Sequence, residues 1–161
     1  MPFYQQLQIL DKYRLQSFQV KPSNRRAFES ISDIIYLEAQ YSPLVLVGKS
    51  WTGKTHLLRA TQRELESRGK RTLYLSGSKL KDDLTEIIRT GGSIRGRKTE
   101  EYLLTLKDFN AIFFDNIEDI KSLEISQKLL VYLLERLGEL GVNTLLSITG
   151  KLKSLTVLNS Y

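Results

Sequence analysis

A glycine-containing octapeptide lies between an apolar run typical of a strand and a segment with apolar residues at helical spacing. Few folds accommodate this order of strand pattern, glycine loop and helix pattern. The residues of the octapeptide are Gly48, Lys49, Ser50, Trp51, Thr52, Gly53, Lys54 and Thr55. Before it, residues 44–47 form a leucine and valine run typical of a buried strand. After it, residues 55–65 carry leucines at helical spacing. The chain must therefore pass from strand to helix through one short loop.

The spacing of this loop matches the pattern G-x-x-x-x-G-K-[ST] in the strand-to-helix context that the pattern requires. Glycines let successive backbone N–H groups and the N-terminus of the next helix point at one centre, which favours a phosphate. We therefore expect residues 48–56, from Gly48 to His56, to bind ATP or ADP. Lys54 would reach the β- and γ-phosphates and Thr55 would bind Mg²⁺. The alternative is a glycine turn that enters a helix without binding a ligand.

Trp51 stands where many such loops carry another glycine. A bulky side chain at this position must either be tolerated by the turn or alter it. If the turn is altered, or if the indole blocks the pocket, nucleotide binding is weakened or lost.

Four apolar runs alternate with helical patterns along the chain. We expect strands at 44–47, 71–75, 111–115 and 144–148, and helices at 24–38, 55–65 and 123–140, the first of them capped by Ser23. This alternation predicts a parallel sheet with helices on both faces, a three-layer α/β/α fold. No repeat or linker divides the chain, so one domain is expected at 161 residues.

The segment between the second and third expected strands is longer than a single crossover helix needs. Leu80, Leu84, Ile87 and Ile88 form one helical stripe, and a second follows around Leu103 and its neighbours Tyr102 and Leu106. Glycines separate the two stripes. We expect an inserted pair of helices around a loop at 90–98.

Asp115 follows the apolar run 111–114 and is expected at the carboxyl end of a buried strand, where ligands of open α/β sheets collect. It fits the magnesium-binding aspartate of a Walker B motif; the alternative is a turn or capping aspartate. The next residue is Asn116, whose neutral amide is a poor general base. Binding is therefore expected to outweigh hydrolysis.

Composition excludes several other chemistries. The chain has no cysteine and one histidine, which rules out disulfides, thiolate metal sites and histidine-clustered zinc. It shows no signal peptide and no apolar stretch long enough to span a membrane, so we expect a cytoplasmic protein without membrane contact. The net charge of +6 makes a polyanionic partner plausible without establishing one.

Five segments resemble the AAA+ proteins of the bacterial replication initiator DnaA and its regulatory paralogue Hda. They are Phe18–Arg25, Gly53–Leu58, Arg97–Tyr102, Phe114–Glu118 and Ile148–Gly150. The resemblance implies an AAA+ core at 16–161 and a role in replication initiation or its control. It implies a DnaA-type initiator, or a second copy of the chain, as partner.

The resemblance also suggests two further ligands. Gln6, Leu7, Ile9 and Leu10, within an N-terminal segment 1–15, are similar to the peptide by which Hda binds the sliding clamp; a frayed tail or a packed strand is the alternative. Arg95, Arg97 and Lys98 fall where DnaA passes single-stranded DNA. A solvated polar loop is the alternative for these three cations.

The chain ends at Tyr161, soon after the fourth expected strand, so we expect neither a C-terminal helical lid nor an arginine finger. Either it is cut from a longer protein or it is a naturally short relative. The leading hypothesis is a nucleotide-binding module with weak or absent hydrolysis. The alternatives are an interaction module with a degenerate nucleotide site and a helicase-loader-like ATPase.

Overall fold

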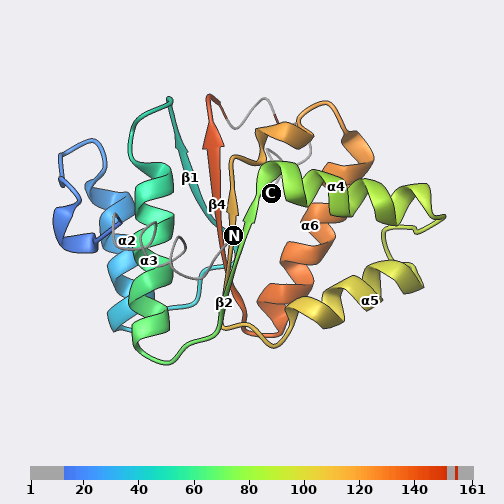
Figure 1. The fold of residues 1–161 in the computed structure, drawn as a ribbon, viewed down its shortest axis with the longest axis horizontal. Coiled ribbons are helices and arrows are strands. Elements are labelled where there is room, and N and C mark those ends of the chain that lie inside the picture. Colours follow the sequence, from blue (N-terminus) through green and yellow to red (C-terminus); the bar gives the residue numbers. More distant parts are fainter. Residues whose placement is uncertain (1–12, 152–154, 156–161) are drawn as a thin grey trace, which may run out of the picture.

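The computed structural model describes residues 13–151 and 155, which form three layers with a parallel sheet in the middle (Figure 1). The strands are β1 (Leu44–Gly48), β2 (Thr72–Ser76), β3 (Ala111–Asp115) and β4 (Asn143–Thr149), and their order across the sheet is β1-β4-β3-β2. All pairs are parallel. The predicted α/β/α fold and its four strands are confirmed.

Strand register brings the functional ends of the strands to one edge of the sheet. Gly48 pairs with Thr149, and Ser76 pairs with Asp115. Because parallel strands end on the same side, the phosphate-loop candidate and Asp115 meet at this carboxyl edge. Side chains alternate across β3, so that Phe113 packs into one core and Phe114 into the other.

One face of the sheet is covered by α2 (Arg25–Tyr36) and α3 (Lys54–Ser67), preceded by the short 3₁₀ turn η1 (Leu15–Ser17). The isoleucine face of α2 and the leucines of α3 pack against Phe113 and Leu145. The same face carries the hydroxyl and carboxylate groups of the candidate site, because Asp115 follows Phe113 by two residues along the strand.

The other face is covered by α4 (Gly77–Arg89), α5 (Arg97–Leu106) and α6 (Glu124–Glu139), with the turn η2 (Ile117–Ile120) after β3 (Figure 1). The predicted helix pair between β2 and β3 is confirmed as α4 and α5. Leu80 and Leu84 of α4 and Leu103 of α5 are buried in this second core, as their helical spacing requires.

Two local expectations were wrong. Ser23 does not cap α2: Asn24 is the capping residue, and its side-chain Oδ1 accepts a hydrogen bond from the Lys21 backbone N–H at 2.7 Å instead of from the helix. The loop expected at 90–98 is shorter, because α5 already begins at Arg97. Arg97 and Lys98 are therefore helical residues.

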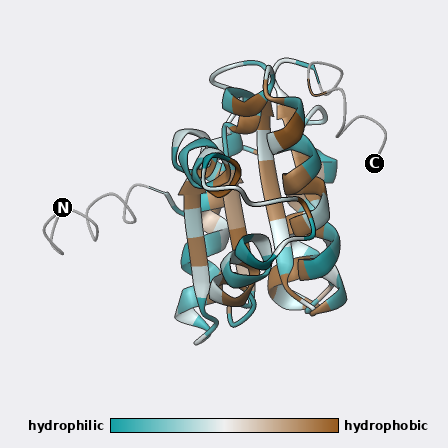
Figure 2. Cartoon of the chain, turned by 90° about the vertical axis from the view of Figure 1, so that its right-hand side faces the viewer, coloured by the Kyte–Doolittle hydropathy of each residue, from teal (hydrophilic) through white to brown (hydrophobic). Residues whose placement is uncertain are grey.

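Hydrophobic residues run along the strands, whereas the helices carry them on one side only (Figure 2). This distribution is that of helices packed on a buried sheet. Within the described part of the chain, none of the helices is both long and apolar enough to cross a bilayer.

The start of α4 touches the turn after β3 without an intervening side chain. A Cβ built on Gly77 would lie 1.9 Å from the backbone oxygen of Asn116, a distance that no real contact allows. Gly77 is buried, and Ser76 caps the helix by accepting from the Lys79 N–H. Only glycine fits at this position while the turn stays where it is.

We expect Gly77→Ala to lower the free energy of unfolding by about 1–3 kcal/mol, because either the Asn116 turn or α4 must move. Helix propensity alone would raise the free energy of unfolding, since alanine is more favourable than glycine in a helix by up to about 1 kcal/mol. Urea unfolding monitored by circular dichroism decides between them. Lys81→Ala, at an exposed position of the same helix, is the control with an effect of about 0.5 kcal/mol or less. Equal or higher stability of Gly77→Ala contradicts the prediction.

Candidate nucleotide site

The loop from β1 to α3 turns as its glycines predict. Gly53, directly before α3, has φ 93°, and Trp51 has φ 65°, so both lie in the left-handed region. The first turn of α3 contains no acidic residue of its own that would oppose a bound anion. A helix start of this kind, with free backbone N–H groups behind a glycine turn, favours an anion.

Lys54 spans the mouth of this loop. Its Nζ donates to the backbone oxygens of Gly48 at 2.9 Å and Lys49 at 2.7 Å. The Thr52 hydroxyl donates to the same Lys49 oxygen at 2.8 Å. These bonds hold the ammonium group at the loop, where a phosphate oxygen could take the place of a carbonyl.

The Trp51 indole does not fill the loop. Its side chain is fully exposed to solvent, although its backbone carries the strained left-handed conformation. Of the two alternatives, a tolerated or an altered turn, the structure has the turn accommodate the bulky residue with an exposed side chain, and Trp51 also contributes to the lining of the neighbouring cleft. The chain has one tryptophan, so its fluorescence arises at this loop alone.

A cleft of about 950 Å³ opens beside the loop, between β1, the start of α2 and the segment before α2. Its lining includes the cations Lys21, Arg26 and Lys54. The Phe18 ring closes one end: a Cβ on Gly53 would lie 2.8 Å from its Cε2, and Phe18 stacks on Phe28 at 6.0 Å between ring centroids. The volume is that of a typical small-molecule site.

His56 connects the first turn of α3 to the segment before α2. Its Nε2 lies 2.9 Å from the backbone oxygen of Arg14, and because a carbonyl only accepts, Nε2 carries the proton. The ring also contacts Tyr13 and Phe18 edge-on. His56 therefore positions this segment against the loop.

Asp115 lies where the strands converge and is only 4% exposed. Its Oδ2 accepts from the Thr55 hydroxyl at 2.8 Å and from the Tyr74 hydroxyl, and its Oδ1 accepts from Ser147. The two residues predicted to serve Mg²⁺, Thr55 and Asp115, are thus in direct contact. Buried carboxylates require such donors.

Tyr74 is itself tightly held. Burial first, and then its hydrogen bond to Asp115, raise the pKa of the Tyr74 phenol above its ordinary value, so the phenol stays protonated and can donate. The Arg59 guanidinium stacks on the Tyr74 ring, 3.2 Å from its centroid, and its positive charge acts to lower the pKa of the same phenol.

The site offers hard oxygen donors of the kind that Mg²⁺ prefers. However, among the residues that the structure describes, no three His, Cys, Asp or Glu side chains come together as a metal cluster. Thr55 and Asp115 therefore fit a cation that takes its remaining ligands from nucleotide phosphates and water, and they do not form an all-protein metal cage.

No carboxylate directly follows Asp115. Asn116 is exposed at φ 59°, and its backbone N–H donates to Ser147 Oγ at 2.8 Å. Glu118 is turned toward the end of β4, where its Oε2 accepts from the Thr149 N–H at 3.1 Å. Asp119 is exposed.

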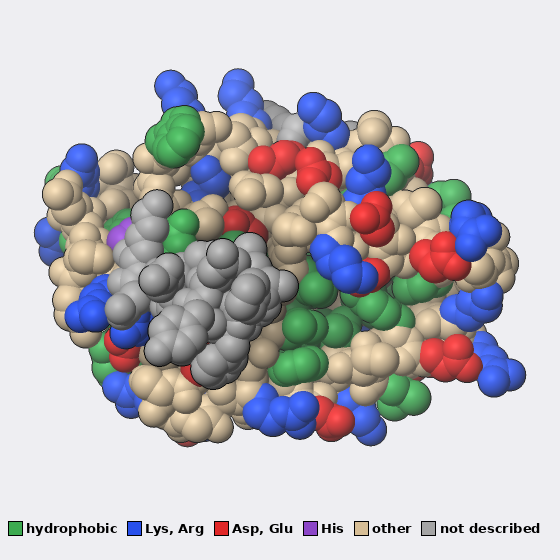
Figure 3. All heavy atoms as spheres, in the orientation of Figure 1, with side chains coloured by type: hydrophobic (Ala, Val, Ile, Leu, Met, Phe, Trp, Pro, Cys, Tyr) green, Lys and Arg blue, Asp and Glu red, His purple; other side chains and the backbone are tan. Residues whose placement is uncertain are grey.

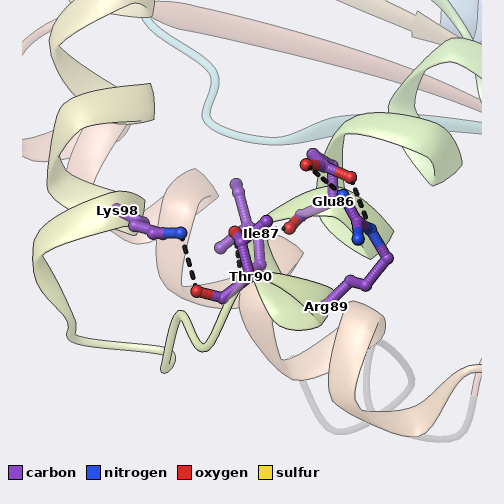
Figure 4. Close-up of polar contacts among 5 residues, drawn as sticks. All are labelled: Glu86, Ile87, Arg89, Thr90 and Lys98. Carbon is purple, nitrogen blue, oxygen red and sulfur yellow. Dashed lines mark hydrogen bonds and ion pairs between the residues drawn. The ribbon is translucent and has the colours of Figure 1, made fainter.

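The three cations expected to meet DNA are each engaged within the protein. Lys98 Nζ donates to the Thr90 backbone oxygen at 2.6 Å, at the end of α4 (Figure 4). Arg97 pairs with Glu101 at 2.8 Å, and Arg95 lies 5.9 Å from the centroid of Tyr132. On the face in Figure 3, basic side chains alternate with acidic ones instead of forming one basic stripe.

Sequence reasoning missed Tyr74, Ser147 and Arg59 as parts of the site. A partial signal existed for Ser147, a hydroxyl between the apolar residues Leu146 and Ile148 near the carboxyl end of an expected strand. Tyr74 and Arg59 carried none, because an aromatic strand residue and a helical arginine are common anywhere. The clamp-peptide residues Gln6, Leu7, Ile9 and Leu10 lie outside the described residues.

The fold and this loop define a P-loop nucleotide-binding domain of the AAA+ class. The sequence matches the family described as the bacterial DnaA ATPase domain over residues 9–160, nearly the whole chain. The chain belongs to this family, and the expected resemblance is confirmed.

Individual relatives agree. DnaA of Herpetosiphon aurantiacus is 31% identical over 139 residues, covering 84% of this chain and 28% of that protein. AMPPCP-bound DnaA from Aquifex aeolicus superposes with a TM-score of 0.73 at 26% identity over 89% of this chain and 44% of the other. A DnaA bound to AMPPCP and single-stranded DNA gives 0.75 at 24% identity, over 92% and 47%. The chain spans less than a third of the curated relatives it matches.

Proposed function

We propose that this domain binds ATP or ADP with Mg²⁺ and acts in bacterial replication initiation or its regulation, through contact with a DnaA-type initiator or a second copy of itself. The strongest support is the 2.8 Å bond between Thr55 and Asp115, which joins the phosphate loop to the end of β3. Residues 48–56 would hold the phosphates. AMPPCP in the Aquifex DnaA supports the same class of ligand.

The competing function is an interaction module without useful nucleotide binding. The full exposure of the Trp51 side chain argues against a loop filled by its indole. A helix start without acidic residues in its first turn and the cations that line the cleft favour an anionic ligand.

Lys54→Ala is expected to weaken ADP binding by about tenfold to a hundredfold, because a charge-assisted hydrogen bond to phosphate is lost. Titration of fluorescent ADP, or quenching of the single tryptophan, measures the change. Lys81→Ala is the matched control: it removes the same charge from an exposed position of α4, on the other helical layer, with little expected loss. Absent binding by the unmodified protein, or equal losses in both variants, would support the interaction module instead.

We further propose that the domain by itself hydrolyses ATP slowly, because Asn116 cannot act as a base. Turnover is expected well below about one per second, the low end of typical enzyme rates. Asn116→Asp should raise it several-fold, since aspartate tolerates the left-handed backbone there. Asp119→Asn, at an exposed carboxylate, should leave it unchanged. Phosphate release at about one per second by the unmodified protein contradicts the proposal.

Single-stranded DNA is the second ligand that we propose, and Arg97 is its best-placed contact. Its side chain is 91% exposed, and exposed ion pairs contribute about 1 kcal/mol or less, so Glu101 competes weakly with a phosphate. Arg95 and Lys98 would contribute after releasing Tyr132 and Thr90. The DNA-bound DnaA shares the fold.

Arg97→Glu is expected to weaken binding of a single-stranded oligonucleotide several-fold and to reduce the salt dependence by about one phosphate contact. Fluorescence anisotropy at several salt concentrations measures both. Lys70→Glu makes the same charge change on the opposite helical layer, where Lys70 pairs with Glu38, and serves as control. Equal weakening of oligonucleotide binding in both variants would show that the loss comes from the change in net charge and not from a contact at Arg97.

A further inference from the structure

The hydrogen bonds to Asp115 nearly exhaust its capacity to accept. A carboxylate has about four lone-pair positions on its two oxygens. Thr55 and Tyr74 occupy both positions of Oδ2, and Ser147 occupies one of Oδ1. One position, on Oδ1, is left for a water bound to Mg²⁺.

Two of the three donors are fixed by a further contact. Ser147 Oγ accepts from the Asn116 N–H at 2.8 Å while donating to Asp115. Tyr74 lies under the Arg59 guanidinium, whose Nη1 donates to Gln62 at 3.2 Å. The carboxylate can therefore rotate only if several bonds break together.

Tyr74 differs from the other two donors because it comes from β2, at the edge of the sheet. It approaches Asp115 from the α3 side and shares Oδ2 with Thr55. Tyr74 and Thr55 both donate to Oδ2. Because the Thr55 hydroxyl donates its proton to Asp115, the lone pairs of its own oxygen remain for a cation.

We propose that Tyr74 is a positioning residue for Mg²⁺: its hydroxyl locks the rotamer of Asp115 so that the free acceptor of Oδ1 faces the metal, and Arg59 holds Tyr74 in place. This inference rests on the proposed nucleotide binding. Mutation of a residue that hydrogen-bonds to a metal-binding group without touching the metal commonly changes the metal affinity by tenfold or more.

The test compares ADP affinity with Mg²⁺ and with EDTA. Tyr74→Phe should reduce the gain in affinity due to Mg²⁺ by about tenfold while leaving affinity in EDTA unchanged. Tyr102→Phe is the matched control: Tyr102 is a part-buried tyrosine whose hydroxyl donates to Asp83 at 3.0 Å on the other helical layer. It should alter neither value.

Arg59→Gln provides a second variant with the tyrosine retained, and it should lower the Mg²⁺ gain by a smaller factor. Circular dichroism confirms that each variant is folded. An unchanged Mg²⁺ gain in Tyr74→Phe, or an equal loss in Tyr102→Phe, overturns the role of Tyr74 while nucleotide binding stands. No ADP binding by the unmodified protein, with or without Mg²⁺, overturns the proposed function and this inference together.

Discussion

A single carboxylate, that of Asp115, determines how the carboxyl edge of the sheet is arranged. It is almost completely buried, and a buried carboxylate is tolerated only when donors surround it. Those donors come from α3, β2 and β4, so three elements far apart in sequence are joined at one pair of oxygens. The phosphate loop is thereby tied to the sheet through Thr55.

The same arrangement separates binding from catalysis. Lys54 and the start of α3 supply positive charge for phosphate, and Asp115 with Thr55 supplies oxygen ligands for a cation. The group that would activate a water is an amide, Asn116, and the nearest part-buried acid, Glu118, is engaged with the end of β4. This distribution of groups is the basis of our proposal that the domain holds a nucleotide and cleaves it slowly.

The sequence was enough to predict the layers, because runs such as 111–115 and the leucine stripe of α6 can be satisfied only by a covered parallel sheet. It also located the loop and Asp115, since both depend on local spacing. It could not reveal Tyr74 and Arg59, whose roles arise only when β2 is paired with β3 and α3 lies over them. The direction of the Trp51 side chain was equally hidden, because spacing does not determine which way a strained residue points.

The bare contact between Gly77 and the Asn116 turn has a mechanical consequence. No side chain separates the two backbones, so the turn cannot move toward α4 without displacing the start of that helix. The thirteen residues of α4 form a helix about 20 Å long. At the far end of α4, Lys98 of α5 donates to the Thr90 backbone oxygen and joins the two helices. The outer end of the helix pair is therefore joined, through α4, to the same turn that follows Asp115.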